Sequence, residues 1–381
     1  MKIIDVEFFP VKAKVRPIEE GGIAPYRGSR DGGAGTSVVT SALYKVRTDE
    51  GIDGWGEMNM ILSLCLTRAI FHDVLRPALI GSDPFDRNRI MGRIESLYNP
   101  DINMLHFASG VEMALWDIMG KATGRPVYQL LGGAARLEAP IAYAMGMMDD
   151  VQTAQKLEQI RREGYRAVKT KGGCDVAWDI RRAHRMRELA GEEMAIRVDM
   201  NQSYSLTQAA AYLSAVKDCR LEYVEQPLCV NALEDYRALR LRAQVPIAIN
   251  EDCYLPGGLF RALRMGAVDA AVVDMESLGG IWETVKLAHI AQAANVPLAH
   301  HCAWDMGIKT AAIIHAVCAL PAFSLPMDST YPSHAQDPLR TPLAIRNGAY
   351  QLPRGPGLGI DVDEEKVCCM VSEDKSARYV F

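Results

Sequence analysis

The most regular feature of the sequence is a series of short apolar runs, each followed by a segment of helical length. Between the runs lie segments with helical spacing of apolar positions, such as 175–190 and 281–293. Eight strand–helix units about 25 residues apart predict an α/β fold, a (β/α)8 (TIM) barrel with parallel strands. The predicted strands are centred near residues 143, 169, 198, 224, 249, 273, 299 and 325.

Different patterns flank this repeat. Residues 1–60 alternate in the manner of strands, and residues 61–132 have the periodicity of helices. Gly132 and Gly133 mark a boundary, and the chain becomes rich in Pro and Gly near its end. We therefore predict an α+β domain over 1–132 and a barrel over 133–335. The remaining segment, 336–381, is expected to pack back on the N-terminal domain.

Two segments of the predicted N-terminal domain stand out. Residues 19–35 are rich in Gly and polar side chains, and an uninterrupted loop of that length is usually either a lid or a flexible, disordered segment. Residues 108–122 have the apolar spacing of a buried helix, in which Gly110 and Gly120 would allow close packing.

Composition narrows the class of protein. The chain has 381 residues, a length that predicts more than one domain. Its hydrophobic content of 49% is that of an ordinary globular protein. A net charge of −5 argues against a nucleic-acid surface, and no apolar run is long enough to span a membrane. Nine cysteines without a Cys-x-x-Cys pair are typical of reduced thiols, so we expect a cytoplasmic protein without a disulfide framework or zinc site.

Three acids, Asp199, Glu225 and Glu251, each close one of the apolar runs and are spaced 26 residues apart. The carboxyl ends of parallel strands meet at one mouth of a barrel, so the three carboxylates are expected to converge. Oxygen ligands of this kind suit a hard divalent cation, and we predict a Mg²⁺ site. A single acid after an apolar run is more often a helix cap than a metal ligand. The predicted metal site therefore depends on the placement of all three acids at strand ends.

Other candidate groups stand at neighbouring strand ends. Lys169 and Lys171 share one face of a strand, and a desolvated lysine beside another cation has a lowered pKa and can act as a base. Asn201 lies on the same face as Asp199. Asp274 could hold the imidazole of His301 in one tautomer, whereas the direction of the adjacent His300 is left open.

These motifs together resemble the mandelate racemase subgroup of the enolase superfamily, over nearly the whole chain. The spacing of 27 residues between Asp274 and His301 is that of the Asp–His pair of the subgroup. The matching segments are Gly54–Glu57, Ala114–Asp117, Arg166–Lys171, Val198–Ser203, Val224–Pro227, Asn250–Glu251, Asp274 with Gly279–Gly280, and His301.

The resemblance implies an α/β fold in which an α+β capping domain lies over a modified (β/α)8 (TIM) barrel, and it implies a role for each candidate residue. Asp199, Glu225 and Glu251 would bind Mg²⁺, Lys171 would be one base, and His301 with Asp274 would be the base or acid on the other face. Lys169 would touch the substrate carboxylate, Asn201 would also contact substrate, and residues 19–35, including Arg27, would form the specificity loop. Asp328 stands where family members often carry an acid that bonds the enolate, although its register is uncertain by one residue.

The implied chemistry is removal of the proton next to a carboxylate, through an enediolate. We favour dehydration of a sugar acid to a 2-keto-3-deoxy acid, because residues 19–35 are polar enough for a polyhydroxylated substrate. Racemisation or epimerisation of a 2-hydroxy acid is the alternative, and a non-catalytic barrel that binds an anion is a third reading. The expected partner is a small carboxylate substrate, without nucleic acid or membrane, and the expected assembly is a homo-oligomer.

Overall fold

The first part of the chain forms an antiparallel sheet covered by helices. The computed structural model describes residues 1–17, 38–59, 63–96 and 104–372. Strands β1 (Ile3–Lys14), β2 (Val38–Thr48) and β3 (Gly54–Asn59) pair in that order, and helix α4 (Leu105–Thr123) packs on β2 and β3. The other helices of this part are α1 (Leu64–Ile70), the π-helix η2 (Phe71–Leu75), α2 (Arg76–Leu79), α3 (Arg87–Ser96) and α5 (Val127–Leu130).

Helix α4 lies close to the sheet because glycines stand at the points of contact. A Cβ atom on Gly110 would lie 2.6 Å from Cδ2 of Tyr44, and one on Gly56 of β3 would overlap the carbonyl oxygen of Gly110. A Cβ atom on Gly120 would lie 2.5 Å from the backbone of Gly357. The predicted close packing at Gly110 and Gly120 is therefore confirmed.

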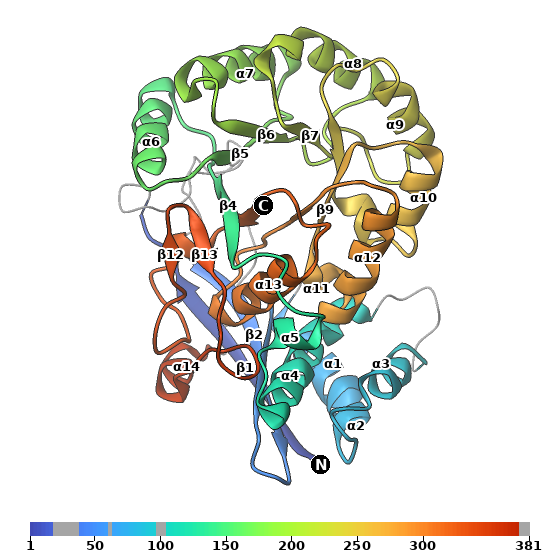
Figure 1. Ribbon diagram of the computed structural model, residues 1–381, viewed down its shortest axis with the longest axis vertical. Helices are drawn as coiled ribbons and strands as arrows, with labels where there is room; N and C mark the ends of the chain where they lie inside the picture. The colour runs from blue at the N-terminus through green and yellow to red at the C-terminus, as the bar shows by residue number, and fades with distance from the viewer. Residues whose placement is uncertain (18–37, 60–62, 97–103, 373–381) are drawn as a thin grey trace.

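The second part is a parallel sheet that curves inside a ring of helices (Figure 1). Its strands are hydrogen-bonded in chain order, and the last of them returns to pair with the first. The strands are β4 (Glu138–Ala144), β5 (Ala167–Lys171), β6 (Ala195–Asp199), β7 (Tyr223–Glu225), β8 (Ile247–Ile249), β9 (Ala270–Val273), β10 (Leu298–His300) and β11 (Met327–Ser329).

The join between β10 and β11 is not a regular ladder. The N–H of Leu298 donates to Ala322 O (2.8 Å), and the N–H of Leu325 donates to Leu298 O (3.2 Å). Strand β10 is thus joined to the segment that precedes β11, while β11 itself pairs with β4. The eighth strand was predicted near residue 325 and lies slightly later, at 327–329.

The helices of this part follow the strands with bounds close to those predicted. Helix α12 has the predicted range, and α7 begins one residue after Asp175, whose side chain accepts from the N–H of Trp178 as an N-cap. The helices are α6 (Asp150–Arg162), α7 (Val176–Ala190), α8 (Leu206–Ala215), η3 (Lys217–Cys219), α9 (Leu233–Arg240), η4 (Glu251–Tyr254), α10 (Gly258–Met265), α11 (Met275–Leu278), α12 (Ile281–Ala293), α13 (Gly307–Ala319) and η5 (Tyr331–Ser333).

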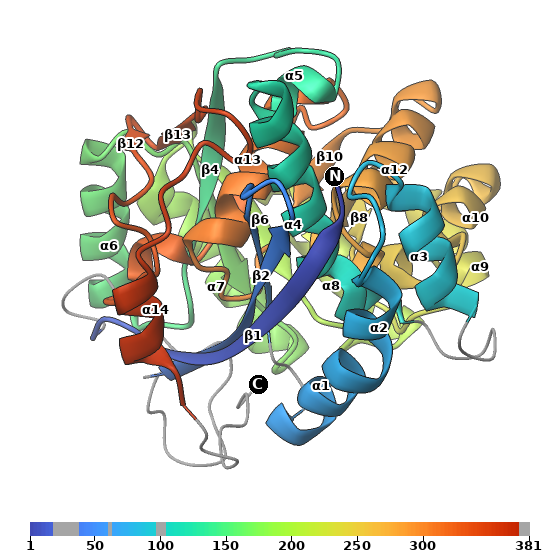
Figure 2. The ribbon, with the colours of Figure 1, turned by 90° about the horizontal axis from the view of Figure 1, so that it is seen from below.

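The last segment contacts both parts. Strand β13 (Ala349–Gln351) pairs with β4 and with β12 (Ile345–Arg346). Helix α14 (Glu364–Met370) lies beside β1 (Figure 2), and the N–H of Ser372 donates to Pro10 O (2.8 Å). All nine cysteines are free thiols. Among the described residues, no helix is both long and apolar enough to cross a membrane.

Candidate active site

The candidate groups stand side by side because the strands pair in register. Lys171, the last residue of β5, is the partner of Asp199 at the end of β6, and Asp199 is in turn the partner of Glu225 at the end of β7. Glu251 begins the turn η4, two residues after β8 ends. The parallel register therefore places three of these groups in one row at the carboxyl edge of the sheet.

Lys169 is buried in the centre of a group of acids. Its Nζ lies 2.8 Å from Glu225 Oε1, 2.9 Å from Asp328 Oδ2 and 3.3 Å from Asp199 Oδ2. Burial alone would lower the pKa of Lys169, but the three carboxylates raise this pKa well above its ordinary value. For Lys169, the prediction of a lowered pKa beside a second lysine is wrong, because the surrounding acids outnumber that cation.

Lys171 is held by two neighbours on β6 and the loop after it. Its Nζ donates to Asp199 Oδ2 and to Asn201 Oδ1, both at 2.7 Å. Burial alone would raise the pKa of Asp199, but the ammonium groups of Lys171 and Lys169 lower it below its ordinary value. Asn201, predicted to contact substrate, thus orients the predicted base in this structure.

The three predicted metal ligands are the carboxylates of Asp199, Glu225 and Glu251. All are hard oxygen donors, and the buried Oε2 atoms of Glu225 and Glu251 accept no hydrogen bond. Burial, with the charge of Asp199 next in effect, raises the pKa of Glu225 to about 7. Over the described ranges, however, no three His, Cys, Asp or Glu side chains gather as a metal-binding group. Lys169 lies between Asp199 and Glu225, so the donors fit Mg²⁺ in chemistry but do not converge here as predicted.

Asp274 and His301 form the pair that their spacing suggested. His301 Nδ1 lies 3.4 Å from Asp274 Oδ2, and Asp274 also caps helix α11 by accepting from the N–H of Glu276. Burial alone would lower the pKa of His301, but the hydrogen bond to Asp274 raises it above its ordinary value. The same acid is therefore both a helix cap and the partner of the imidazole.

The direction of His300 is now clear. Its Nε2 accepts from the N–H of Met275 (3.1 Å), and its Nδ1 donates to His301 O (2.5 Å). Burial lowers the pKa of His300 to about 4, so the ring is neutral at neutral pH. His300 therefore fixes the backbone behind the Asp274–His301 pair.

Asp328 points into the barrel. Its Oδ2 accepts from Lys169 (2.9 Å), and its Oδ1 lies 3.2 Å from Nη1 of Arg197, a fully buried cation. Burial would raise the pKa of Asp328, but Lys169 and Arg197 lower it. Because both oxygens are taken by cations, Asp328 orients Lys169 in this structure. Arg27 and the predicted specificity loop lie outside the described residues.

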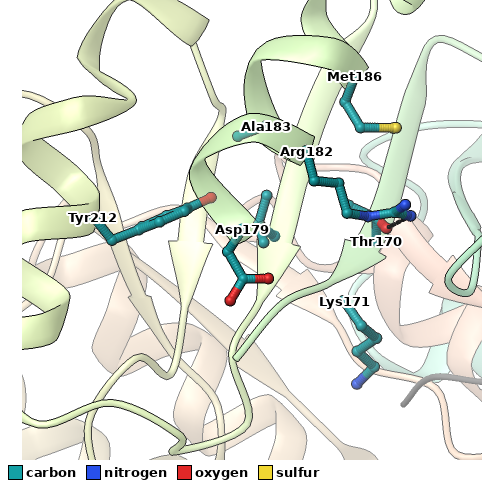
Figure 3. A pocket seen from close by; sticks show the side chains of 8 residues that line it. Thr170, Lys171, Asp179, Arg182, Ala183, Met186 and Tyr212 are labelled. Atoms are coloured by element: carbon teal, nitrogen blue, oxygen red, sulfur yellow. Dashed lines mark hydrogen bonds between the residues drawn. The ribbon is translucent and has the colours of Figure 1, made fainter. Parts of the chain in front are cut away.

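A small cavity of about 10 Å³ lies behind the end of β5. Asp179 and Arg182 of α7 and Tyr212 of α8 line it, while the Lys171 ammonium points away from Arg182 (Figure 3). Asp179 Oδ2 accepts from the N–H of Gly173 (2.9 Å). The volume is that of one water molecule, so the cavity is too small for a carboxylate substrate. Its polar side chains instead fix the loop that follows Lys171.

Comparison with known proteins identifies the family to which the chain belongs. Residues 25–132 match the N-terminal domain of mandelate racemase and muconate lactonizing enzyme, and residues 152–366 match the enolase C-terminal domain-like family. The chain belongs to the mandelate racemase and muconate lactonizing enzyme group of the enolase superfamily.

Relatives within this superfamily carry out several reactions. D-galactarolactone cycloisomerase of Agrobacterium fabrum is 31% identical over 85% of this chain and 89% of that protein. D-galactonate dehydratase of Ralstonia pickettii is 29% identical over the same shares, 85% and 89%. N-succinyl-L-Arg/Lys racemase of Bacillus cereus is 28% identical over 86% and 89%.

A crystal structure of N-succinyl Arg/Lys racemase from Bacillus cereus has the same fold, with a TM-score of 0.88 at 24% identity, and covers 97% of this chain and 98% of that one. The fold and the membership of an enzyme superfamily are therefore established. At these identities, the relatives leave the reaction open among dehydration, racemisation and cycloisomerisation.

Sequence reasoning missed one feature of this enolase-superfamily site. Four non-glycine residues that follow candidate strands adopt the left-handed backbone conformation. They are Asn201, Gln202, Gln226 and Trp304, with φ of 41°, 63°, 39° and 61°. Such conformations are uncommon outside glycine and cluster at functional sites. Asn adopts positive φ more often than most residue types, so Asn201 was a weak sequence signal for this conformation. Gln202, Gln226 and Trp304 gave no such signal.

Proposed function

We propose that this enzyme removes the proton next to a substrate carboxylate and then eliminates a β-hydroxyl, dehydrating a sugar acid to a 2-keto-3-deoxy acid. The observation that carries the proposal is the pair of proton carriers at the barrel mouth. Lys171 ends β5 and His301 follows β10, and β4 and β11 lie between these strands. Both carriers keep some exposure, with side chains 13% and 20% accessible.

Charge decides whether such a reaction is feasible. Loss of the proton converts the carboxylate to an enediolate dianion, which water stabilises poorly. We propose that Asp199, Glu225 and Glu251 hold Mg²⁺ once their side chains turn toward one another from the separate positions described above. The ion, when bound, would supply positive charge to the substrate carboxylate, as is known for enolase-superfamily sites. The Lys169 ammonium supplies a second, fixed positive charge where the dianion develops.

The proton movements follow from the side chains. Lys171 Nζ, as the free amine, takes the proton from the α-carbon, and the C–H electrons form the carbon–carbon double bond of the enediolate. His301, as the imidazolium favoured by its raised pKa, gives its Nε2 proton to the departing β-hydroxyl. The π electrons of the enediolate form a double bond between the α- and β-carbons while the C–O electrons leave with the oxygen as water. The resulting enol takes a proton at its β-carbon and loses the proton of its hydroxyl, which gives the 2-keto product.

Two observations support a sugar acid as substrate. The predicted loop at 19–35 carries Glu19, Glu20, Arg27, Ser29 and Arg30, which suit a polyhydroxylated acid better than an aromatic one. Two of the relatives described above are enzymes of galactonate and galactarolactone. We carry the acid-sugar class, and no particular sugar, over to this chain.

Epimerisation is the second candidate, and the same pair of proton carriers favours it. If the substrate lacks a β-hydroxyl, His301 can return a proton to the α-carbon on the face opposite to Lys171. The 28% identity to a racemase is in keeping with this route.

The deciding experiment is a screen of aldonic and aldaric acids with Mg²⁺, followed by semicarbazide detection of 2-keto products. We expect product from at least one acid. If no acid gives product but NMR in D₂O shows exchange of the α-proton, the epimerase proposal replaces dehydration. If no acid or 2-hydroxy acid shows either signal, both proposals fail.

Variants assign the two roles. Lys171→Ala should abolish both exchange and dehydration, and His301→Asn should abolish dehydration while Lys171 still exchanges the α-proton. General acid–base groups of this kind contribute about 10²–10⁴-fold in rate. Lys286→Ala and His289→Asn, at exposed positions of α12, are the matched controls and should keep full activity. Full turnover by either active-site variant would contradict the assignment.

A further inference from the structure

Helix α13 carries a lysine that neither the sequence motifs nor the proposed reaction uses. Lys309 is fully buried, in a helix whose other residues are largely apolar. Its Nζ lies 2.7 Å from Glu276 Oε2, 2.7 Å from Asp305 Oδ1 and 3.3 Å from Asp274 Oδ1. A buried ammonium with three carboxylate partners costs much to desolvate and persists only with good geometry.

The third contact joins Lys309 to the candidate active site. Asp274 has two carboxylate oxygens, and each has a different partner. Oδ1 faces Lys309 and accepts from the N–H of Glu276 (2.9 Å), while Oδ2 faces His301 Nδ1 at 3.4 Å. Lys309 therefore attracts one oxygen of the Asp274 carboxylate, and the other oxygen orients the imidazole of His301.

The positive charge of Lys309 stabilises the ionised form of Asp274. Burial alone would raise the pKa of Asp274, but the Lys309 ammonium lowers it below its ordinary value. Without that cation, the buried carboxylates of Asp274, Glu276 and Asp305 would repel one another. At least one would take up a proton or turn away, and the fixed acceptor for His301 Nδ1 would be lost.

The same lysine is anchored to the first sheet of the molecule. Glu57 of β3 accepts from the backbone N–H groups of Met306 (2.7 Å) and Lys309 (2.9 Å), which fixes the start of α13. The N–H of Asn59, also in β3, donates to Glu276 Oε2 (3.0 Å), the atom that Lys309 also contacts. An unbroken series of hydrogen bonds and ion pairs thus runs from β3 through Lys309 to Asp274.

We propose that Lys309 is a positioning residue that holds Asp274 toward His301 and so fixes the imidazole in the tautomer with hydrogen on Nδ1. The proposal rests on the proposed function for its catalytic meaning, because only that tautomer leaves Nε2 facing the substrate as the atom that exchanges protons. The geometry of the pair itself can be tested without any substrate.

The test is ¹⁵N NMR of the ring nitrogens in protein labelled at histidine, at a pH where the His301 ring is neutral. The His301 signals are assigned by their loss in His301→Asn. In the wild-type protein we expect the Nδ1–H tautomer to dominate. In Lys309→Met we expect that preference to be lost, with most of the rings carrying hydrogen on Nε2.

Two further variants keep the test decisive. Lys309→Met with Asp305→Asn removes one charge of each sign, so the buried cluster keeps its net charge if the single variant does not fold. Lys45→Met removes another buried, ion-paired lysine, which contacts Glu364 at 2.7 Å, and should leave the His301 tautomer unchanged.

Three results would overturn the proposal. They are a wild-type ring without the Nδ1–H tautomer, a folded Lys309 variant that keeps it, or an equal loss in Lys45→Met. Failure of the acid-sugar screen would not affect this measurement, so the two proposals fail separately.

Discussion

His315 offers a direct test of the buried electrostatics of this protein, away from the candidate active site. The ring is fully buried in α13, where Nδ1 accepts from the N–H of Tyr128 (3.3 Å) and Nε2 donates to Leu358 O (3.0 Å). A second proton would have to enter on Nδ1, where it would face the N–H of Tyr128. We therefore consider His315→Gln, which keeps an amide donor for Leu358 O but cannot titrate.

The sign and size of the effect follow from the pKa. Burial lowers the pKa of His315 from 6.5 to about 4, so between these values the unfolded chain binds more protons than the folded one. Stability from this group is present in full above pH 6.5 and is lost as pH falls toward 4. By linkage, His315 should remove roughly 2 kcal/mol from the free energy of unfolding between about pH 7 and pH 4.5.

The assay is urea unfolding followed by far-UV circular dichroism at several pH values in that range. Every other titrating group is common to both proteins, so the difference between wild type and His315→Gln isolates this residue. The wild type should lose roughly 2 kcal/mol more than the variant on acidification. His289→Gln, at an exposed position, should behave as the wild type. Parallel stability curves for wild type and His315→Gln would refute the reasoning.

Three other perturbations give clear expectations. Glu57→Ala should lower the free energy of unfolding in urea by roughly 2–6 kcal/mol, because two backbone N–H groups at the start of α13 lose their acceptor. Glu57→Gln keeps an acceptor oxygen and should cost much less. Equal losses in the two variants would argue against the role of Glu57 as this acceptor. Gly56→Ala should abolish soluble expression, because the added Cβ overlaps Gly110 O, whereas Gly92→Ala, with nothing within 4 Å, should be tolerated; a stable Gly56→Ala protein would contradict the packing. Chelation with EDTA should abolish turnover in the acid-sugar assay and Mg²⁺ should restore it, with unchanged circular dichroism because Lys169 and Lys171 also balance the acids; turnover that survives chelation would exclude the metal site.

Local pattern was sufficient for the order and approximate place of the elements in the barrel. Alternation and helical spacing are properties of neighbouring residues, so the predicted helix 281–293 has the observed range of α12. The same periodicity put Lys171, Asp199 and Glu225 at strand ends, and the parallel register brought them together. Asp274 has two roles, because it is both the N-cap of α11 and the partner of His301. A prediction that assigns one role to a residue misses the other.

What the sequence alone determined was therefore the repeat of strands and helices and the residue types at the strand ends. Only the tertiary structure decided which charges neutralise one another. Lys169 meets Asp328 across 159 residues of chain, His300 turns behind the active-site pair, and Lys309 reaches Asp274 from a helix that reads as apolar. The physical reason is that such contacts depend on how the sheet closes and on which elements pack together, and a local pattern of polar and apolar positions contains neither.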